Sequence, residues 1–299
     1  MNSLFIRQNV FPVLAALIWG AAFVAQSVGA GLVGPFTFNA VRNVLAFFFL
    51  LAICLGRNKW RVRQSPATPP VVLTRGLLVA GICCGIALSG IAYFQQKGLE
   101  TTTAGKAGFI TALYIVLVPI AGIFLKKKAP KTIVVSVTLA VVGLYLLCIN
   151  EEFSITVGDI YVLVCAFCCT AHIMFIDYFS QKEDGVAMSC IQFLVVAVIS
   201  FVGMALTEEP SLPAILSSAV PILYTGIFSS GIGFTLQILA QKGTDPTRVS
   251  LLMSLESVFA VVAGAIILGD QMSGREYFGC ALMLVAVVLA QLPDSKKVE

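Results

Sequence analysis

Ten runs of about twenty mostly apolar residues follow one another along this chain, separated by short polar stretches. A helix of about twenty residues crosses a hydrocarbon layer about 30 Å thick, because each residue adds about 1.5 Å. Only 11% of the residues are charged and 59% are hydrophobic, so a soluble globule could not cover the apolar surface. The sequence therefore predicts an all-α membrane protein.

The apolar runs divide into two sets of five, one in each half of the chain. The runs of the first half lie near residues 10–30, 36–56, 71–94, 104–125 and 133–149. The runs of the second half lie near residues 160–179, 186–206, 219–240, 249–268 and 278–292. We therefore expect ten transmembrane helices, with residues 1–150 as a first five-helix repeat and residues 151–299 as a second.

Basic residues are distributed unevenly between the two sides that these spans define. If the amino terminus starts inside, only Lys97, Lys106 and Arg275 fall outside, and Arg42 is the one basic residue within a span. The others fall on the inner side: Arg7, Arg57, Lys59, Arg61, Arg63, Arg75, Lys126, Lys127, Lys128, Lys131, Lys182, Lys242, Arg248, Lys296 and Lys297. Because basic loops stay in the cytoplasm, we predict a multi-pass protein of the plasma (inner) membrane with both termini cytoplasmic. The net charge of +4 is thus an orientation signal, and no nucleic-acid partner is expected.

Two spans carry related sequences, which indicates a duplication. The third span contains SGIAY at 89–93 and QKG at 96–98, and the eighth contains SGIGF at 230–234 and QKG at 241–243. Because five spans is an odd number, the second copy enters the membrane from the opposite face, as in the inverted repeats of many secondary transporters. The alternative is that small residues recur at helix contacts without common descent. We favour two inverted five-helix repeats around a central cavity.

Four stretches resemble the drug/metabolite transporter superfamily, in particular its ten-helix EamA-type members. They are IWGAAF at 18–23, FTFNAVR at 36–42, AGFITALY at 107–114 followed by Pro119, and LESVFA at 255–260. The resemblance implies a cavity lined mostly by spans one to four and six to nine, with spans five and ten at the periphery. It also implies transport of small organic metabolites, such as amino acids, by alternating access. Ser257 stands where many relatives carry proline, which leaves a kink in the ninth span open.

Charged residues inside the apolar spans are the principal candidates for a substrate site, because a charge in the bilayer costs several kcal/mol unless a cavity or partner receives it. Arg42 is a candidate anchor for an anion, and helical spacing places Asn39 and Ala46 on its face. Glu256 is a candidate receptor for a cation or a proton-coupling group. The alternative for both is a structural ion pair or interhelical hydrogen bonds.

Further polar and aromatic side chains are candidates to bind substrate. The amides Gln95, Gln96, Gln237 and Gln241 lie near the ends of the third and eighth spans, where bonding to neighbouring backbone groups is the favoured alternative. The aromatic residues Trp19, Tyr93 and Tyr114 could stack on a flat or cationic substrate, although packing between helices is the commoner role.

The single histidine, His172, follows Cys165, Cys168 and Cys169 at helical spacing, which resembles a metal site. We favour the alternative in which these thiols are small apolar groups, because no fourth ligand is evident except Asp177. No metal or other cofactor is therefore expected.

The energy source is constrained by what the sequence lacks. The string AGKA at 104–107 lacks the other residues of a phosphate-binding loop, and the longest expected loop, near 57–70, is too short for an ATPase domain. Transport is therefore driven by the solute gradient or by a coupled ion, and protons acting through Glu256 are our hypothesis. A homodimer is left open.

Two features of the third and fourth spans bear on packing. Gly81, Gly85 and Ser89 form a ladder of small residues that permits close helix approach, and Pro119 is expected to bend its helix. A pore with Arg42 as its selectivity element remains an alternative to a carrier. A membrane enzyme is the weaker alternative, because converging acids, bases or metal ligands are not evident.

Overall fold

The computed structural model describes residues 3–64, 72–125, 130–148, 155–267 and 273–291, and within these ranges it contains helices and turns but no strand. Its elements are α1 (Ser3–Phe5), η1 (Ile6–Val10), α2 (Phe11–Ala30), α3 (Pro35–Gln64), α4 (Arg75–Gly98), α5 (Ala104–Ala112), α6 (Tyr114–Phe124), α7 (Lys131–Cys148), α8 (Val157–Phe179), α9 (Gly185–Thr207), α10 (Leu212–Ser217), α11 (Ala219–Leu223), η2 (Tyr224–Gly233), α12 (Phe234–Gln241), α13 (Pro246–Met253), α14 (Glu256–Ile267) and α15 (Gly274–Gln291). The segments labelled η are π-helices.

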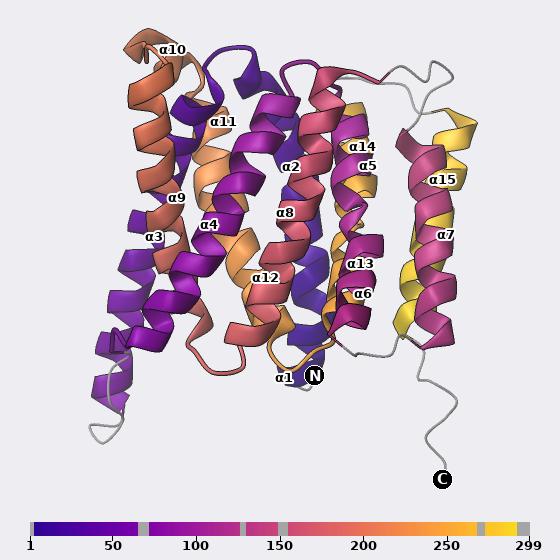
Figure 1. Cartoon of the computed structure of the whole chain (residues 1–299), viewed down its shortest axis with the longest axis horizontal. Coiled ribbons are helices and arrows are strands. Elements are labelled where there is room, and N and C mark those ends of the chain that lie inside the picture. The colour runs from indigo at the N-terminus through magenta and orange to yellow at the C-terminus, as the bar shows by residue number, and fades with distance from the viewer. Residues whose placement is uncertain (1–2, 65–71, 126–129, 149–154, 268–272, 292–299) are drawn as a thin grey trace.

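Eight helical segments are long and apolar enough to cross a membrane. They are Ile6–Ala30, Pro35–Gln64, Arg75–Gly98, Ala104–Phe124, Val157–Phe179, Gly185–Thr207, Ala219–Gln241 and Pro246–Ile267. The remaining two predicted runs correspond to α7 and α15, which pack against each other at one side of the bundle (Figure 1). The prediction of an all-helical membrane protein is confirmed.

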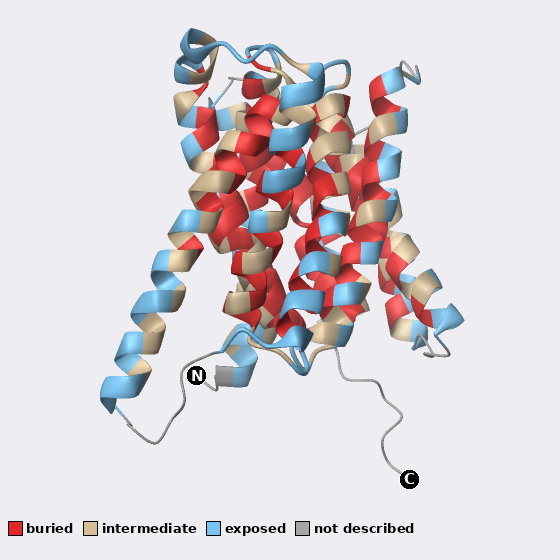
Figure 2. Ribbon diagram, turned by 60° about the vertical axis from the view of Figure 1, so that its left-hand side comes forward, coloured by how far each residue is buried: buried red, intermediate tan, exposed pale blue. Residues whose placement is uncertain are grey.

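The outside of the bundle is apolar, as a surface in contact with lipid should be. Figure 2 shows the buried residues concentrated on the inner faces of the helices, with exposed residues on the outside and at the ends. Large apolar side chains are among the most exposed, including Phe124 (83%), Ile266 (79%) and Val220 (78%). This surface would be unstable in water and is satisfied by a bilayer.

The helices run up and down between two ends of the bundle (Figure 1). We call the end with the α4–α5 loop the upper end and the end with the α8–α9 loop the lower end. The first helix begins and α15 ends at the lower end, while α4 and the segment α11–η2–α12 run in opposite directions. The described basic residues that we predicted to be internal lie towards the lower end, and Lys126, Lys127, Lys128, Lys296 and Lys297 lie outside the described residues.

Side-chain caps fix where several of the helices begin. A threonine or aspartate oxygen before the first turn accepts a hydrogen bond from a backbone N–H that has no partner within the helix. The capping residues are Thr74 for α4, Thr103 for α5, Thr156 for α8, Asp184 for α9 and Asp245 for α13.

The fourth and ninth predicted spans are interrupted rather than continuous. The first breaks at Leu113, whose N–H donates to Ile110 O at 3.2 Å, and the second breaks before Glu256, where Leu255 N–H donates to Leu252 O at 3.3 Å. Each is a tight turn that bonds three residues back instead of four. Pro119, where we expect a bend, lies inside α6, and the interruption at Leu113 precedes it.

Contacts at both ends hold α3 against α9. At the upper end the carboxylate of Glu208 accepts hydrogen bonds from Phe36 N and Thr37 N, both at 2.8 Å, and so caps α3 from a neighbouring helix. At the lower end Arg57 pairs with Asp184 at 2.5 Å. Partial burial by itself raises the pKa of Asp184, but the hydrogen bonds from Ala187 N and Arg57 outweigh it and lower that pKa below its ordinary value.

The contact between α2 and α14 depends on a residue without a side chain. A Cβ atom at Gly20 would lie 2.4 Å from Phe259 Cβ and 2.7 Å from its carbonyl carbon, so the two backbones are in direct contact. We expect Gly20→Ala to lower the free energy of unfolding by about 1–3 kcal/mol, because the helices must separate to admit the methyl group. Denaturation of the purified protein in detergent measures the change. Gly105→Ala is the control, since no atom lies within 4 Å of its added Cβ, and equal stability of the two variants would contradict the prediction.

Candidate functional site

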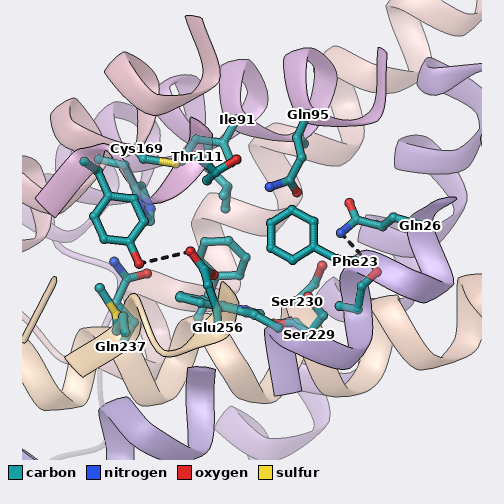
Figure 3. A pocket seen from close by; sticks show the side chains of 18 of the residues that line it. Phe23, Gln26, Ile91, Gln95, Thr111, Cys169, Ser229, Ser230, Gln237 and Glu256 are labelled. Carbon is teal, nitrogen blue, oxygen red and sulfur yellow. Dashed lines mark hydrogen bonds between the residues drawn. The ribbon is translucent and has the colours of Figure 1, made fainter. Parts of the chain in front are cut away.

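A narrow internal cavity lies between the helices of both halves (Figure 3). Its walls are formed by Trp19, Ala22, Phe23, Gln26, Arg42, Asn43, Leu88, Ile91, Ala92, Gln95, Thr111, Tyr114, Cys169, His172, Ile173, Phe193, Ser229, Ser230, Phe234, Gln237, Met253 and Glu256. Among the described residues, α7 and α15 contribute none of these side chains. The cavity thus combines an apolar lining with a few polar groups, which is the composition of small-molecule sites in general.

Aromatic rings form one wall of the cavity. Trp19 lies with its ring centroid 4.7 Å from that of Phe234, which in turn meets His172 at 5.7 Å and Phe193 at 5.8 Å edge to face. The indole N–H of Trp19 donates to the backbone oxygen of Ser229 at 3.3 Å, so the ring is fixed by a hydrogen bond across helices. Such a wall gives an apolar solute a rigid surface.

The π-helix η2 contributes Ser229 and Ser230 to the cavity. The hydroxyl of Ser230 donates to Asn43 Oδ1 at 3.3 Å, which joins η2 to α3. The wider turn of a π-helix changes which side chains face inward, and such turns are frequent at functional sites.

Arg42 places a positive charge in the cavity wall. Its side chain is buried, and its Nη1 donates to Gln26 Oε1 at 2.9 Å. The guanidinium carbon also lies 5.5 Å from the centre of the Phe38 ring. A guanidinium has five N–H donors, and Gln26 takes one of them.

Glu256 begins α14 directly after the interruption of its helix and places a carboxyl group in the same cavity. The hydroxyl of Tyr114 donates to Glu256 Oε1 at 3.0 Å, and Tyr114 itself begins α6 directly after the other interruption (Figure 3). Neither Arg42 nor Glu256 forms an ion pair with another described residue. The structural ion pair considered from the sequence is therefore not formed, and both residues instead make interhelical hydrogen bonds.

Several buried polar atoms of the cavity wall have no hydrogen-bond partner. They are Arg42 Nε, Thr111 Oγ1 and Gln237 Oε1. A buried polar atom without a partner costs about 1–3 kcal/mol, so these atoms gain from a polar ligand or from water in the cavity. They supply at least one donor and one acceptor.

The structure brings together six of the eight residues that we selected from the sequence as substrate-binding. Trp19, Arg42, Gln95, Tyr114, Gln237 and Glu256 all line the cavity. Asn39 does not, because its Nδ2 donates to Ala92 O at 2.9 Å between α3 and α4. Tyr93 does not either, since its ring stacks on Phe36 at 4.4 Å outside the cavity. Both residues contribute to helix packing.

The glutamines of the repeated QKG sequence bond to backbone, as favoured from the sequence. Gln96 Nε2 donates to Gln26 O at 3.1 Å, and Gln241 Nε2 donates to Ile173 O at 3.2 Å. Both side chains are buried. In each case the third or eighth span is tied to the first span of its own half, α2 or α8.

The cysteine and histidine series on α8 contributes to the cavity without converging on one point. Cys169 and His172 line the cavity, with Cys165 Sγ 3.9 Å from Cys169 Sγ. His172 Nε2 is 3.0 Å from Gln192 Oε1, which fixes the ring by a hydrogen bond. Cys168 lies outside the cavity wall. In the described part of the chain, no three His, Cys, Asp or Glu side chains are grouped so that they could hold a metal ion.

Sequence reasoning missed much of the wall. A polar residue within an apolar run is the signal that could have found Gln26, Asn43, Thr111, Ser229 and Ser230. The apolar members, Phe23, Leu88, Ile91, Phe193 and Phe234 among them, carry no such signal, because apolar residues of a membrane helix face lipid, neighbours or cavity alike.

Comparison with known proteins identifies the family. The model of the EamA-like transporter family matches residues 8–149 and again residues 156–292. A solved crystal structure superimposes with a TM-score of 0.78 at 19% identity, covering 95% of this chain and 96% of the other, which shows a shared fold.

Three relatives illustrate the range of similarity. An uncharacterized transporter of Archaeoglobus fulgidus is 32% identical, with 93% of this chain and 84% of the relative covered. A WAT1-related chloroplastic protein of Arabidopsis thaliana is 23% identical over 92% of this chain and 67% of that protein. The uncharacterized transporter YoaV of Bacillus subtilis is 20% identical, with 94% of this chain and 95% of the relative covered. The apolar helices and these matches agree that this chain is a multi-pass membrane transporter, and it belongs to the EamA-like transporter family.

Proposed function

We propose that this chain is a secondary transporter that moves small zwitterionic metabolites, such as amino acids, across the plasma membrane by alternating access. The observation that carries the proposal is the pair of oppositely charged residues in one cavity. Arg42 and Glu256 both line it, come from different halves, and have no ion-pair partner among the described residues. An anionic group of the solute supplies a partner to Arg42, and either a proton or the cationic group of the solute supplies one to Glu256.

The rest of the wall fits a small solute of this kind. The unpartnered Nε of Arg42 can donate to a carboxylate, and Gln237 Oε1 can accept from an ammonium group. The aromatic wall around Trp19 and Phe234 can receive an apolar side chain. The narrowness of the cavity favours small solutes.

Correspondence between the two halves supports ten spans arranged as inverted repeats. Tyr114 and Glu256, 142 positions apart, each follow the interruption of a helix and bond to one another. Packing between the halves also corresponds. The second spans, α3 and α9, pack on each other, and so do the fifth spans, α7 and α15. The third span α4 packs on the sixth span α8, just as the eighth span, η2 and α12, packs on the first span α2. Two bundles of opposite orientation around one site are the arrangement on which alternating access depends.

The unequal distribution of basic residues supports a cytoplasmic lower end, with both termini on that side. Protons are the proposed coupling ion, because the carboxyl group of Glu256 can take up and release one within the cavity. No ATPase domain is needed for this mode of transport.

Counterflow in liposomes tests the proposal. We expect proteoliposomes loaded with unlabelled amino acids to take up the labelled compound faster than empty ones, with saturation as the external concentration rises. A screen of amino acids by thermal shift of the purified protein identifies which compound to use. Flux without saturation, or conductance without counterflow, would replace the carrier with a pore.

A further inference from the structure

A close seam joins the two halves at the upper end of the bundle. There the end of α4 meets the start of α8 at Gly98 and Gly158. A Cβ atom at Gly158 would lie 2.5 Å from Gly98 O, and one at Gly98 would lie 2.4 Å from Val162 Cγ2. The two backbones are thus in contact, and a solute cannot pass between them.

A buried carboxylate forms hydrogen bonds across this contact between the two halves. Asp159 is 6% exposed and accepts hydrogen bonds from Thr102 Oγ1 at 2.6 Å and Lys106 Nζ at 2.5 Å. Thr102 and Lys106 belong to the first half, on the α4–α5 loop and the first turn of α5, whereas Asp159 belongs to α8 of the second half. The same carboxylate accepts from Thr156 N at 2.7 Å, which fixes it at the start of its own helix.

An apolar cluster lies between this seam and the cavity. It joins Phe23, Leu99, Ala107, Ile110, Val162 and Ala260. Phe23 belongs to both the cluster and the cavity wall, where Figure 3 shows it, so the cluster adjoins the cavity. Leu99 and Val162 lie at the seam itself, so a motion that parts α4 from α8 also opens the cluster.

We propose that the α4–α5 loop and the start of α8 form the gate of the cavity at the upper end, with Asp159 as the latch that Thr102 and Lys106 engage. This inference rests on the proposed transport function, whose topology puts the gate on the external face. When the latch is released, the loop and α8 separate, and the cavity opens to that side. The latch stabilises the closed state because its charge-assisted hydrogen bonds join the two halves and are broken on opening.

Labelling of a cavity thiol measures gate opening without requiring transport. Cys169 lines the cavity, and a small, permanently charged methanethiosulfonate that cannot cross the bilayer reaches it only through an open gate. We expect Asp159→Asn to increase labelling of Cys169 from the external face about tenfold, equivalent to about 1.4 kcal/mol in the opening equilibrium. Tandem mass spectrometry of protein from intact cells locates the label and separates it from the neighbouring Cys168.

Two further variants make the outcome decisive. Lys106→Gln weakens the latch but leaves the cap between Asp159 and Thr156 intact, so it gives the same increase even if Asp159→Asn folds poorly. Glu100→Gln breaks another 2.5 Å lysine pair, with Lys97, that lies at the same end without crossing between halves, and it leaves labelling unchanged. Wild-type labelling rates in both latch variants would overturn the gate even where counterflow succeeds. Increased labelling without counterflow would retain the gate and reject the transporter.

Discussion

Glu256→Gln is expected to abolish accumulation of substrate driven by a proton gradient, while counterflow without a gradient continues. Glutamine keeps the size of the side chain and an oxygen that can accept the hydrogen bond from Tyr114, now 3.0 Å from Glu256. It cannot bind or release a proton. Uptake into proteoliposomes with an imposed pH difference therefore falls to the level reached without one, whereas the exchange of labelled for unlabelled solute is preserved.

The same variant distinguishes the two roles considered for Glu256. If the carboxylate instead binds the cationic group of the substrate, counterflow also falls, by roughly 10- to 100-fold for the loss of one charged hydrogen bond. Glu209→Gln is the matched control, because Glu209 is exposed after α9 and lies outside the cavity. If Glu256→Gln shows the same accumulation and the same counterflow as the wild type, Glu256 neither binds substrate nor couples transport to protons.

The charged members of the site could be predicted from the sequence because the bilayer makes them exceptional. Arg42 and Glu256 interrupt apolar runs, and a charge there needs a cavity or a partner wherever its helix packs. The fold class followed from the same physics, since only helices with satisfied backbone groups fit runs of this length and composition. These inferences depend on the apolar bilayer that surrounds the protein, and they do not depend on how the helices are arranged.

The rest of the site depends on that arrangement. Asn39 shares a buried face of α3 with Arg42, yet its amide meets the backbone of α4 while Arg42 meets the cavity. A separation of three residues along α3 is enough to change what a side chain contacts. The sequence does not specify which helix lies next to each position. The interruptions at Leu113 and Leu255 were equally hidden, because no glycine or proline stands there and the tight turns depend on packing within the bundle.

Arg42→Lys is expected to weaken binding of an anionic or zwitterionic substrate roughly 10- to 100-fold. Lysine retains the charge but loses the planar fork of donors, so it cannot bond to Gln26 Oε1 and to a carboxylate in the geometry that arginine allows. The ligand concentration needed for half of the maximal thermal shift measures the affinity directly. Counterflow then shows the same loss as a higher concentration for half-maximal uptake.

Arg57→Lys is the control, because it makes the same replacement of arginine by lysine at a position outside the cavity. Arg57 pairs with Asp184 at 2.5 Å at the lower end and does not line the cavity, so its replacement leaves substrate affinity unchanged. A structural role for Arg42 predicts a different pattern, in which Arg42→Lys lowers the melting temperature of the ligand-free protein and leaves the concentration dependence intact. Only an anion-binding role makes the loss specific to the substrate carboxylate, so an uncharged analogue of the substrate should bind the wild type and Arg42→Lys equally.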